Sequence, residues 1–239
     1  MIESVNNEKV KFWAKLNEKK YQNESGLFLV EGEHLVFEAE KAGCLEETIV
    51  LKGYEDKYKG AFIVSQNVMK KISMLASIPK VIGVARKITS KGIKGNVLLL
   101  DGIQNPGNLG TIIRSAVAFN IDTIVLGEGT VSLYNPKVIR ATEGLMFHIN
   151  IVEKDLSSAI LELKERDYKI YSTKVDGGTP LKKTTFNEKT GLVIGSEGSG
   201  VSDAISKMCD EYLYIPMNED CESLNVGVAT SIILYELNK

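Results

Sequence analysis

Residues 97–114 read VLLLDGIQNPGNLGTIIR, and this stretch decides the fold prediction. Val97–Leu100 is a continuous apolar run, which is typical of a strand buried on both faces of a sheet. Residues 105–107 are turn-forming, and Asn108 is suited to cap a helix that continues to Phe119. The stretch therefore predicts a strand, a turn and a helix, with backbone N–H groups at the helix start free to face an anion.

The same alternation of segments continues to the end of the chain. Strands alternating with helices indicate βαβ crossovers and a mostly parallel sheet covered on both faces. In such sheets ligands bind beyond the carboxyl ends of the strands, where the glycine-rich loops of this sequence fall. Further strands are predicted at Thr123–Leu126, Ile149–Val152, Lys169–Ser172, Leu192–Ile194 and Tyr212–Ile215, and further helices at Pro136–Ala141, Leu156–Arg166, Asp203–Met208 and Ser223–Leu237.

The first part of the chain predicts a separate, smaller α/β unit. Residues 8–24 show roughly helical spacing of their apolar side chains, and the polar, basic stretch 86–96 is typical of a linker. We therefore expect two domains, residues 1–90 and 91–239. In the smaller one, strands are predicted at Leu27–Val30, Thr48–Leu51, Phe62–Val64 and Val81–Ala85, and helices at His34–Ala42 and Val68–Met74.

The composition is that of an ordinary globular protein. The chain has 239 residues, 44% of them hydrophobic and 25% charged, and a chain of this length buries a core without disulfide or metal staples. Its apolar runs are too short to cross a bilayer, and Met1–Lys11 lacks the apolar core of a signal peptide. We therefore expect a cytoplasmic protein with no membrane partner. The cysteines and histidines are too scattered for a disulfide framework or a metal site: Cys44, Cys209, Cys221, His34 and His148.

The net charge argues weakly against a general nucleic-acid binder. It is −2, whereas nonspecific binding draws on positive charge. Basic residues concentrated on one face would still bind RNA. The segment Lys80–Lys94 holds five basic and no acidic residues, which fits either such a patch or a solvated linker: Lys80, Arg86, Lys87, Lys91 and Lys94.

A second loop, Gly195–Gly200, reads GSEGSG and follows a predicted strand. Its glycine spacing is not that of the dinucleotide fingerprint, and no G-K-[ST] occurs in the chain, so neither phosphate-loop pattern is present. Glu197 suits a cationic or hydroxyl-bearing ligand more than a phosphate. Glycines allow close approach of a backbone to a ligand, although a plain glycine turn has the same residues.

A third segment, Ile215–Ala229, leads into an apolar helix. Ser223 and Asn225 are both suitable N-cap residues. Met217 is more often a core residue than a ligand contact. By itself this segment is a capped helix.

Taken together, the three segments resemble the motifs of the SpoU/TrmH family of RNA ribose methyltransferases. The matching pieces are Asn108-x-Gly-x-x-x-Arg114, Ile194-Gly-Ser-Glu-Gly, and Ile215-Pro-Met followed by Glu222-Ser-Leu-Asn-Val. Tyr134–Ala141 and Gly144-x-x-Phe147 also resemble the family. The front segment, Lys9–Glu40, is similar to the family's substrate-binding domain, which is related to the ribosomal protein L30e fold.

The resemblance implies a fold, a cofactor and a set of site residues. The fold would be an α/β trefoil-knot (SPOUT) domain behind a small L30e-like α/β domain, working as a homodimer on ribosomal RNA. S-adenosylmethionine would be held near Gly195, Ile215, Met217, Leu224 and Asn225. The catalytic residues would be Arg114, Asn108, Glu197, Ser223 and Asn225.

Two positions depart from the family pattern, and one family role is physically awkward. Glu219 stands where relatives usually carry Gly, and Gly227 where Ser or Ala is common. Arg114 occupies a position for which a general-base role has been proposed, but a guanidinium stays protonated in proteins. We prefer a hypothesis in which Arg114 clamps a phosphate and stabilises the developing alkoxide.

Other functions fit the same residues less well. A tRNA methyltransferase would use the same chemistry, and the rRNA preference depends only on the N-terminal domain. A non-catalytic RNA-binding or ribosome-assembly protein would not need the full catalytic set. Antibiotic resistance through rRNA methylation would differ in biology alone. A nicotinamide or nucleotide enzyme lacks its phosphate loop.

Overall fold

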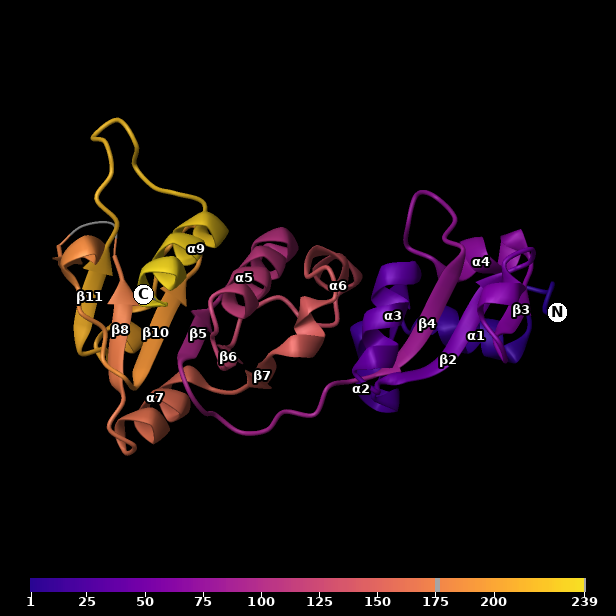
Figure 1. Cartoon of the computed structure of the whole chain (residues 1–239), viewed down its shortest axis with the longest axis horizontal. Helices are drawn as coiled ribbons and strands as arrows, with labels where there is room; N and C mark the ends of the chain where they lie inside the picture. Colours follow the sequence, from indigo (N-terminus) through magenta and orange to yellow (C-terminus); the bar gives the residue numbers. More distant parts are fainter. Residues whose placement is uncertain (175–176, 239) are drawn as a thin grey trace. The chain divides into compact units, whose positions relative to one another are not determined.

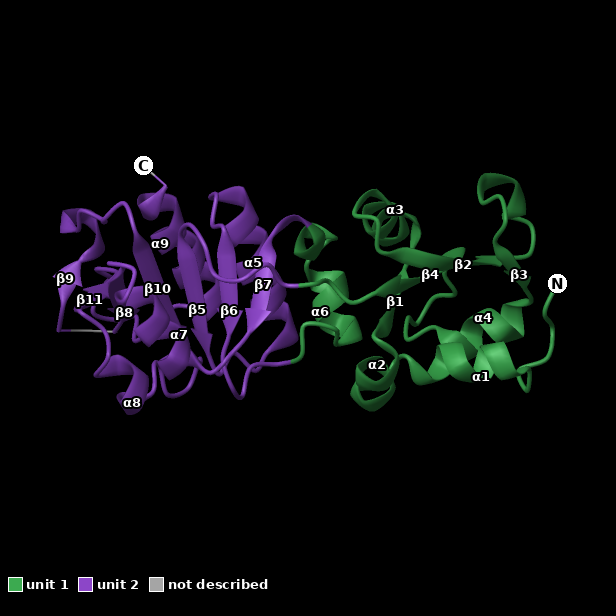
Figure 2. Cartoon of the chain, turned by 90° about the horizontal axis from the view of Figure 1, so that it is seen from below, with its two compact units in different colours: residues 1–89, 132–147 green, residues 90–131, 148–239 purple. Residues whose placement is uncertain are grey.

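The computed structural model describes residues 1–174 and 177–238, which form two compact units (Figure 2). The first unit contains residues 1–89 together with 132–147. The second contains residues 90–131 together with 148–239. The segment 132–147 therefore packs with the N-terminal part of the chain, although it lies between two strands of the second unit.

The second unit is built on a seven-stranded sheet in the order β7-β6-β5-β10-β8-β11-β9 (Figure 1). Every neighbouring pair of these strands is parallel, which confirms the predicted α/β class with its mostly parallel sheet. The strands are β5 (Val97–Asp101), β6 (Thr123–Leu126), β7 (Asn150–Glu153), β8 (Lys169–Thr173), β9 (Thr179–Pro180), β10 (Thr190–Gly195) and β11 (Glu211–Tyr214).

Helices cover both faces of this sheet. On one face α7 (Leu156–Lys164) packs through Leu156, Ala159, Ile160 and Leu163 against alternate strand residues such as Leu99. The helices α5 (Pro106–Ala118) and α9 (Val226–Leu237) pack against each other on the opposite side from α7 (Figure 1). Strands buried on both faces explain the continuous apolar runs in the sequence. The short helix α8 (Asp203–Ser206) follows β10.

The first unit has a four-stranded sheet in the order β1-β4-β2-β3. Only the β2–β3 pair is parallel. Trp13 is fully buried in its core and donates its indole N–H to Glu47 Oε2 over 2.7 Å. The elements are α1 (Glu8–Lys15), α2 (Lys19–Ser25), β1 (Leu27–Glu31), α3 (Glu33–Lys41), β2 (Leu45–Leu51), β3 (Phe62–Val64), α4 (Gln66–Ile72) and β4 (Val81–Arg86), with α6 (Pro136–Ala141) from the inserted segment.

The inserted segment is held to this unit by buried contacts. Gln22 is almost fully buried and donates from Nε2 to the carbonyl oxygens of Leu16 and Tyr134. The rings of Phe28 and Tyr134 lie 4.8 Å apart between centroids. These contacts show how residues with more than a hundred positions between them come to share one core.

Several boundaries differ from the prediction. The helical spacing over residues 8–24 corresponds to two helices, α1 and α2, because the chain turns between them at Asn17, whose Nδ2 donates to the Ile72 carbonyl oxygen over 2.8 Å. The last helix starts at Val226, three residues later than expected. Helix ends depend on which of several polar residues caps them, and spacing alone does not decide that.

The basic segment Lys80–Lys94 does not form one free patch. Arg86 pairs with Glu46 and donates to the Gly43 carbonyl oxygen, and the Lys80 ammonium lies 5.0 Å from the centre of the Tyr54 ring. Among residues 1–174 and 177–238, no helix is long and apolar enough to span a membrane, and no three His, Cys, Asp or Glu side chains gather as metal ligands would.

Candidate active site

A cavity of about 620 Å³ opens at the carboxyl edge of the second unit's sheet. Three chain segments form most of it, and each includes the last residues of a strand and the loop that follows: Thr173–Lys174 at the end of β8, residues 194–201 at the end of β10, and residues from the stretch 213–226 at the end of β11. The volume is within the range of about 300–1,000 Å³ that small-molecule sites occupy. Its other walls come from α8 and from Ala229 and Ile233 of α9.

The loop after β10 can close only because position 195 is glycine. Ser196 and Gly200 exchange two backbone hydrogen bonds of 3.0 Å each, so the chain folds back on itself. A Cβ atom at Gly195 would lie 1.9 Å from the carbonyl carbon of Gly200. Any side chain at Gly195 would therefore force the loop open, and the loop is what carries Glu197 to the cavity wall.

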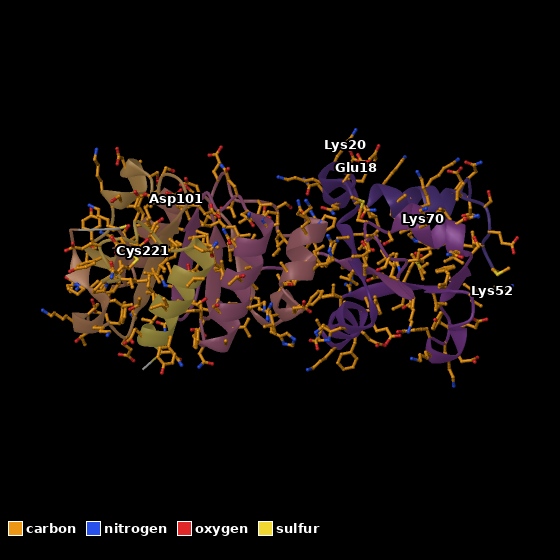
Figure 3. The ribbon with its side chains drawn as sticks, turned by 90° about the horizontal axis from the view of Figure 1, so that it is seen from above. Glu18, Lys20, Lys52, Lys70, Asp101 and Cys221 are labelled. Atoms are coloured by element: carbon orange, nitrogen blue, oxygen red, sulfur yellow. The ribbon has the colours of Figure 1, made fainter. Side chains whose placement is uncertain are left out.

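Asp101 anchors the other end of this loop. It is the last residue of β5 and lies opposite Gly195 in the sheet register. Its Oδ2 accepts a 2.8 Å hydrogen bond from the backbone N–H of Ser202 (Figure 3 labels Asp101). The loop between Gly195 and Ser202 is thus fixed at both ends, and the sequence did not single out Asp101 as a separate contributor.

Asn105, and not Asn108, caps α5. The Asn105 side chain accepts from the N–H groups of Gly107 and Asn108, and Pro106 takes the first helical position. Proline suits that position because its missing N–H would have no partner there. The prediction of Asn108 as the cap is wrong, and the consequence is chemical: the Asn108 side chain is free for another use.

Asn108 joins two of the other segments by hydrogen bonds. Its Nδ2 donates to Glu197 Oε1, and its Oδ1 accepts from Asn225 Nδ2 over 3.0 Å. Asn225 is the N-cap of α9, and its Oδ1 accepts from the N–H groups of Gly227 and Val228. The result is a continuous chain of polar contacts from the start of α9, through α5, to the carboxylate beside the cavity.

Ser223 and Arg114 stand differently toward the cavity. Ser223 lines it, whereas Arg114 lies further along α5 and does not. The Arg114 side chain is exposed, and it has no hydrogen bond or ion pair with any residue in the described part of the chain.

The predicted cofactor residues are mostly at the cavity. Gly195, Ile215, Met217 and Leu224 all line it, and Asn225 is linked to it through Asn108. Sequence reasoning missed Thr173, Leu213 and the α8 residues Asp203 and Ser206. The rule that ligands bind beyond the carboxyl ends of parallel strands would have found Thr173, had it been applied to β8 as well.

Charge in the cavity favours a cationic ligand. Among the described residues, three carboxylates line it, those of Glu197, Asp203 and Glu222, against a single lysine, Lys174. The Lys174 ammonium lies 3.7 Å from the centre of the Tyr212 ring.

The Cys209 thiol is not a candidate nucleophile. Burial raises its pKa to about 11, so this thiol is protonated at neutral pH.

Both family departures have a structural explanation. Glu219 is exposed at a turn in which the Cys221 N–H donates to the Asn218 carbonyl oxygen, and it does not line the cavity. At Gly227, a Cβ would lie 3.0 Å from Thr111 Cγ2. Glycine therefore relieves a tight contact between the start of α9 and α5, which a Cβ would make unless Thr111 shifted slightly.

The comparison with protein families agrees with this geometry. Residues 95–235 match the model of the SpoU rRNA Methylase family, and residues 7–83 match the MRM3-like substrate binding domain. The chain belongs to the SpoU rRNA methylase family. The predicted class, an S-adenosylmethionine-dependent RNA 2′-O-ribose methyltransferase, is thereby confirmed.

Individual relatives match this family member over its full length. The chain is 37% identical to the Bacillus subtilis (strain 168) 23S rRNA (guanosine(2553)-2′-O)-methyltransferase RlmP, over 99% of this chain and 98% of that protein. A TrmH-family structure from Porphyromonas gingivalis superposes with a TM-score of 0.88, at 28% identity and 98% coverage of both chains. AviRb of Streptomyces viridochromogenes, solved with its cofactor AdoMet, shares the fold at a TM-score of 0.86, 22% identity and 98% and 97% coverage.

Substitutions at Asn225 separate its two tasks. Asn225→Asp keeps the capping oxygen, so we expect its free energy of unfolding to stay near that of the wild type. Asn225→Ala lacks this oxygen, and its free energy of unfolding should be lower by about 1 kcal/mol. Both variants lose the N–H that Asn108 accepts, and methyl transfer should fall by about 10²-fold. Urea unfolding and a methyl-transfer assay measure the two effects.

The matched control is Asn7→Asp, because Asn7 caps α1 in the same way, through the N–H of Lys9. This control should leave stability and transfer unchanged. Full activity in Asn225→Asp would show that the contact between Asn225 and Asn108 has no role in the site.

Proposed function

We propose that this enzyme methylates the 2′-hydroxyl of one ribose in 23S ribosomal RNA. The observation that carries the proposal is the match to the B. subtilis 23S rRNA enzyme, which extends over both the substrate-binding and the catalytic part of the chain. An enzyme with this substrate works where ribosomes are assembled, so we also propose a cytoplasmic location.

The two parts of the chain would divide the work. We assign RNA binding to residues 1–90, as an L30e-like domain, and methyl transfer to residues 91–239. The two family models, which cover residues 7–83 and 95–235, support this division. The segment 132–147 belongs by sequence to the catalytic part and by packing to the first unit.

The residues present fit S-adenosylmethionine. Apolar side chains of Ile215, Met217 and Leu224 offer a surface for a purine ring, and the carboxylates of Glu197 and Glu222 complement positive charge. When bound, the cofactor supplies an electrophilic methyl group on a sulfonium. Closure of the loop over Gly195 keeps the backbone around the cavity in place before any ligand arrives.

The polar chain through Asn108 would orient the reacting groups. Glu197 uses Oε1 to accept from Asn108, which leaves Oε2 to accept from a ligand hydroxyl or ammonium. Ser223 lines the same cavity and can donate to a ribose oxygen. Alignment of this kind contributes roughly 7–11 kcal/mol to catalysis when the reactants are held near the attack geometry.

Arg114 would act on the RNA. Its guanidinium is exposed and unpaired among the described residues, so its N–H groups are available for a phosphate or for the developing alkoxide. A protonated guanidinium stabilises negative charge but does not remove a proton. We therefore assign Arg114 the role of a clamp.

We propose that the site is completed in a homodimer. Three apolar side chains, spaced four and three residues apart, form an exposed stripe along α9. Val228 is 46% exposed, Ile232 37% and Tyr235 54%. A second copy of this chain is the occupant that fits, because a two-fold interface pairs such a stripe with itself. α5, which carries Arg114, packs beside α9 through the 2.6 Å contact between Ser115 Oγ and Ser231 Oγ.

The competing functions have less support. A tRNA substrate would not explain two of the matches. These are the match of residues 7–83 to a substrate-binding domain and the full-length match to a 23S rRNA enzyme. A non-catalytic RNA-binding protein would not need the ordered contacts among Asn108, Glu197 and Asn225.

Mapping of ribose methylation tests the proposed substrate. Ribosomal RNA from cells that lack this protein should miss one 2′-O-methyl group in 23S rRNA, and purified protein with S-adenosylmethionine should restore it. Reverse transcription at low nucleotide concentration locates the group. A complete set of 2′-O-methyl groups in the rRNA, with a loss in tRNA instead, would overturn the rRNA assignment.

Mixing two inactive variants tests whether Arg114 acts across the dimer. Arg114→Ala and Glu197→Gln should each be nearly inactive alone. After subunit exchange, half of the dimers would be mixed, and each would hold one site with both residues intact. We expect about one quarter of the wild-type rate if Arg114 serves the partner's cavity.

If both residues serve the same subunit, exchange restores nothing. The control variant is Arg166→Lys. Arg166 lies just beyond α7, and its side chain donates to the Ile93 carbonyl oxygen. This substitution should leave methyl transfer intact. Arg114→Lys should lose most activity, because an ammonium cannot form the paired contacts of a guanidinium.

A further inference from the structure

A second hollow, of about 430 Å³, lies between α1 and α2 of the first unit. All of its lining residues come from these two helices, and they include two aromatic rings, those of Phe12 and Tyr21. It is separate from the cofactor cavity, which belongs to the second unit. It lies within the part of the chain that matches a substrate-binding domain, and that match names no residue or ligand for it.

Phe12 presents an apolar face to solvent. Its neighbours Val10, Trp13 and Leu16 are fully buried in the core, whereas Phe12 is 41% exposed on the outer side of α1. A single exposed aromatic residue is ordinary. Here, however, the ring borders a hollow whose opposite wall is the half-buried ring of Tyr21.

Two cations lie near the Tyr21 ring. The ammonium groups of Lys15 and Lys20 lie 5.0 Å and 5.7 Å from the centre of the Tyr21 ring. In the described part of the chain, neither is within ion-pair distance of a carboxylate, in contrast to Lys11, which pairs with Glu8 over 2.8 Å. Figure 3 shows the Lys20 side chain projecting from the unit beside Glu18. Two positive charges are therefore available to a ligand.

The hollow also contains a free acceptor. Glu24 lines it and has no cation within ion-pair distance among the described residues. Carboxylates accept hydrogen bonds from the amino and imino groups of nucleobases. The second carboxylate in the lining, that of Glu8, is already paired with Lys11. The hollow therefore offers an apolar ring for a base to stack on, the carboxylate of Glu24 for N–H groups, and the ammonium of Lys15 for a phosphate, with that of Lys20 beside the hollow near the Tyr21 ring.

We infer that this hollow binds one unpaired nucleotide of the RNA substrate, with the base on Phe12 and a phosphate between Lys15 and Lys20. The inference depends on the proposed function for the identity of the RNA. Unpaired bases are the parts of folded RNA that proteins read by stacking and by hydrogen bonds to base edges. The hollow thus selects a looped-out nucleotide of the RNA.

Steady-state kinetics of the full-length enzyme test this, with rRNA from cells that lack the protein as the substrate. Phe12→Ala should raise the KM for rRNA by about 5- to 100-fold, the range that loss of one stacked base produces. The kcat at saturating rRNA and the Kd for S-adenosylmethionine should not change. Phe12→Trp should restore the KM, because a larger ring still stacks.

The lysines predict a salt signature. Lys15→Ala and Lys20→Ala should each reduce the slope of log KM against log salt by about 0.7, the value for one phosphate contact on a single strand. The matched controls are Phe37→Ala, on α3, whose side chain is 57% exposed and outside the hollow, and Lys70→Ala, on α4. Both should behave as the wild type.

The outcomes are distinguishable. If the wild type methylates rRNA and Phe12→Ala has the same KM as Phe37→Ala, the nucleotide site is wrong while the proposed function stands. If the wild type does not methylate rRNA, the proposed function itself fails. If Phe12→Ala abolishes binding of a ribosomal protein and leaves naked rRNA unaffected, the hollow is a protein contact and the inference is overturned.

Discussion

One side-chain amide, that of Asn108, connects the parts of the proposed catalytic site. It bonds to Glu197 on the loop after β10 and to Asn225 at the start of α9. An amide is suited to this position because it offers a donor on one side and an acceptor on the other. The contact exists only because Asn105 caps α5 and leaves Asn108 free. The catalytic arrangement thus begins with the choice between two asparagines three residues apart.

The other special residues can be understood as conditions for this contact. Gly195 lets the loop fold back so that Glu197 faces the cavity, and Asp101 holds the far end of that loop through Ser202. Gly227 relieves a tight contact between the start of α9 and α5 at Thr111. A cavity prepared in this way needs little rearrangement when a ligand binds, and such preorganisation is a large part of enzymatic rate enhancement.

Much of the fold could be predicted from the sequence, because buried parallel strands and amphipathic helices have strong local patterns. β6 was predicted to the residue, and most of the other large elements were found within three residues. The cap of α5 could not be predicted with the same security, since both Asn105 and Asn108 are capping residues, although Pro106 favoured Asn105. The packing of residues 132–147 with the first unit depends on long-range contacts that periodicity does not contain. Thr173 escaped notice because nothing in its own residue type points to a ligand.

We propose that Asn108 and Glu197 act as one unit in methyl transfer. A double-mutant cycle tests it most directly, with kcat/KM for rRNA measured in Asn108→Ala, Glu197→Ala and the double variant. If the two side chains work only through their mutual contact, the kcat/KM of the double variant should be about that of the less active single variant. Losses that multiply, so that the double variant shows the product of the two single effects, would contradict the account.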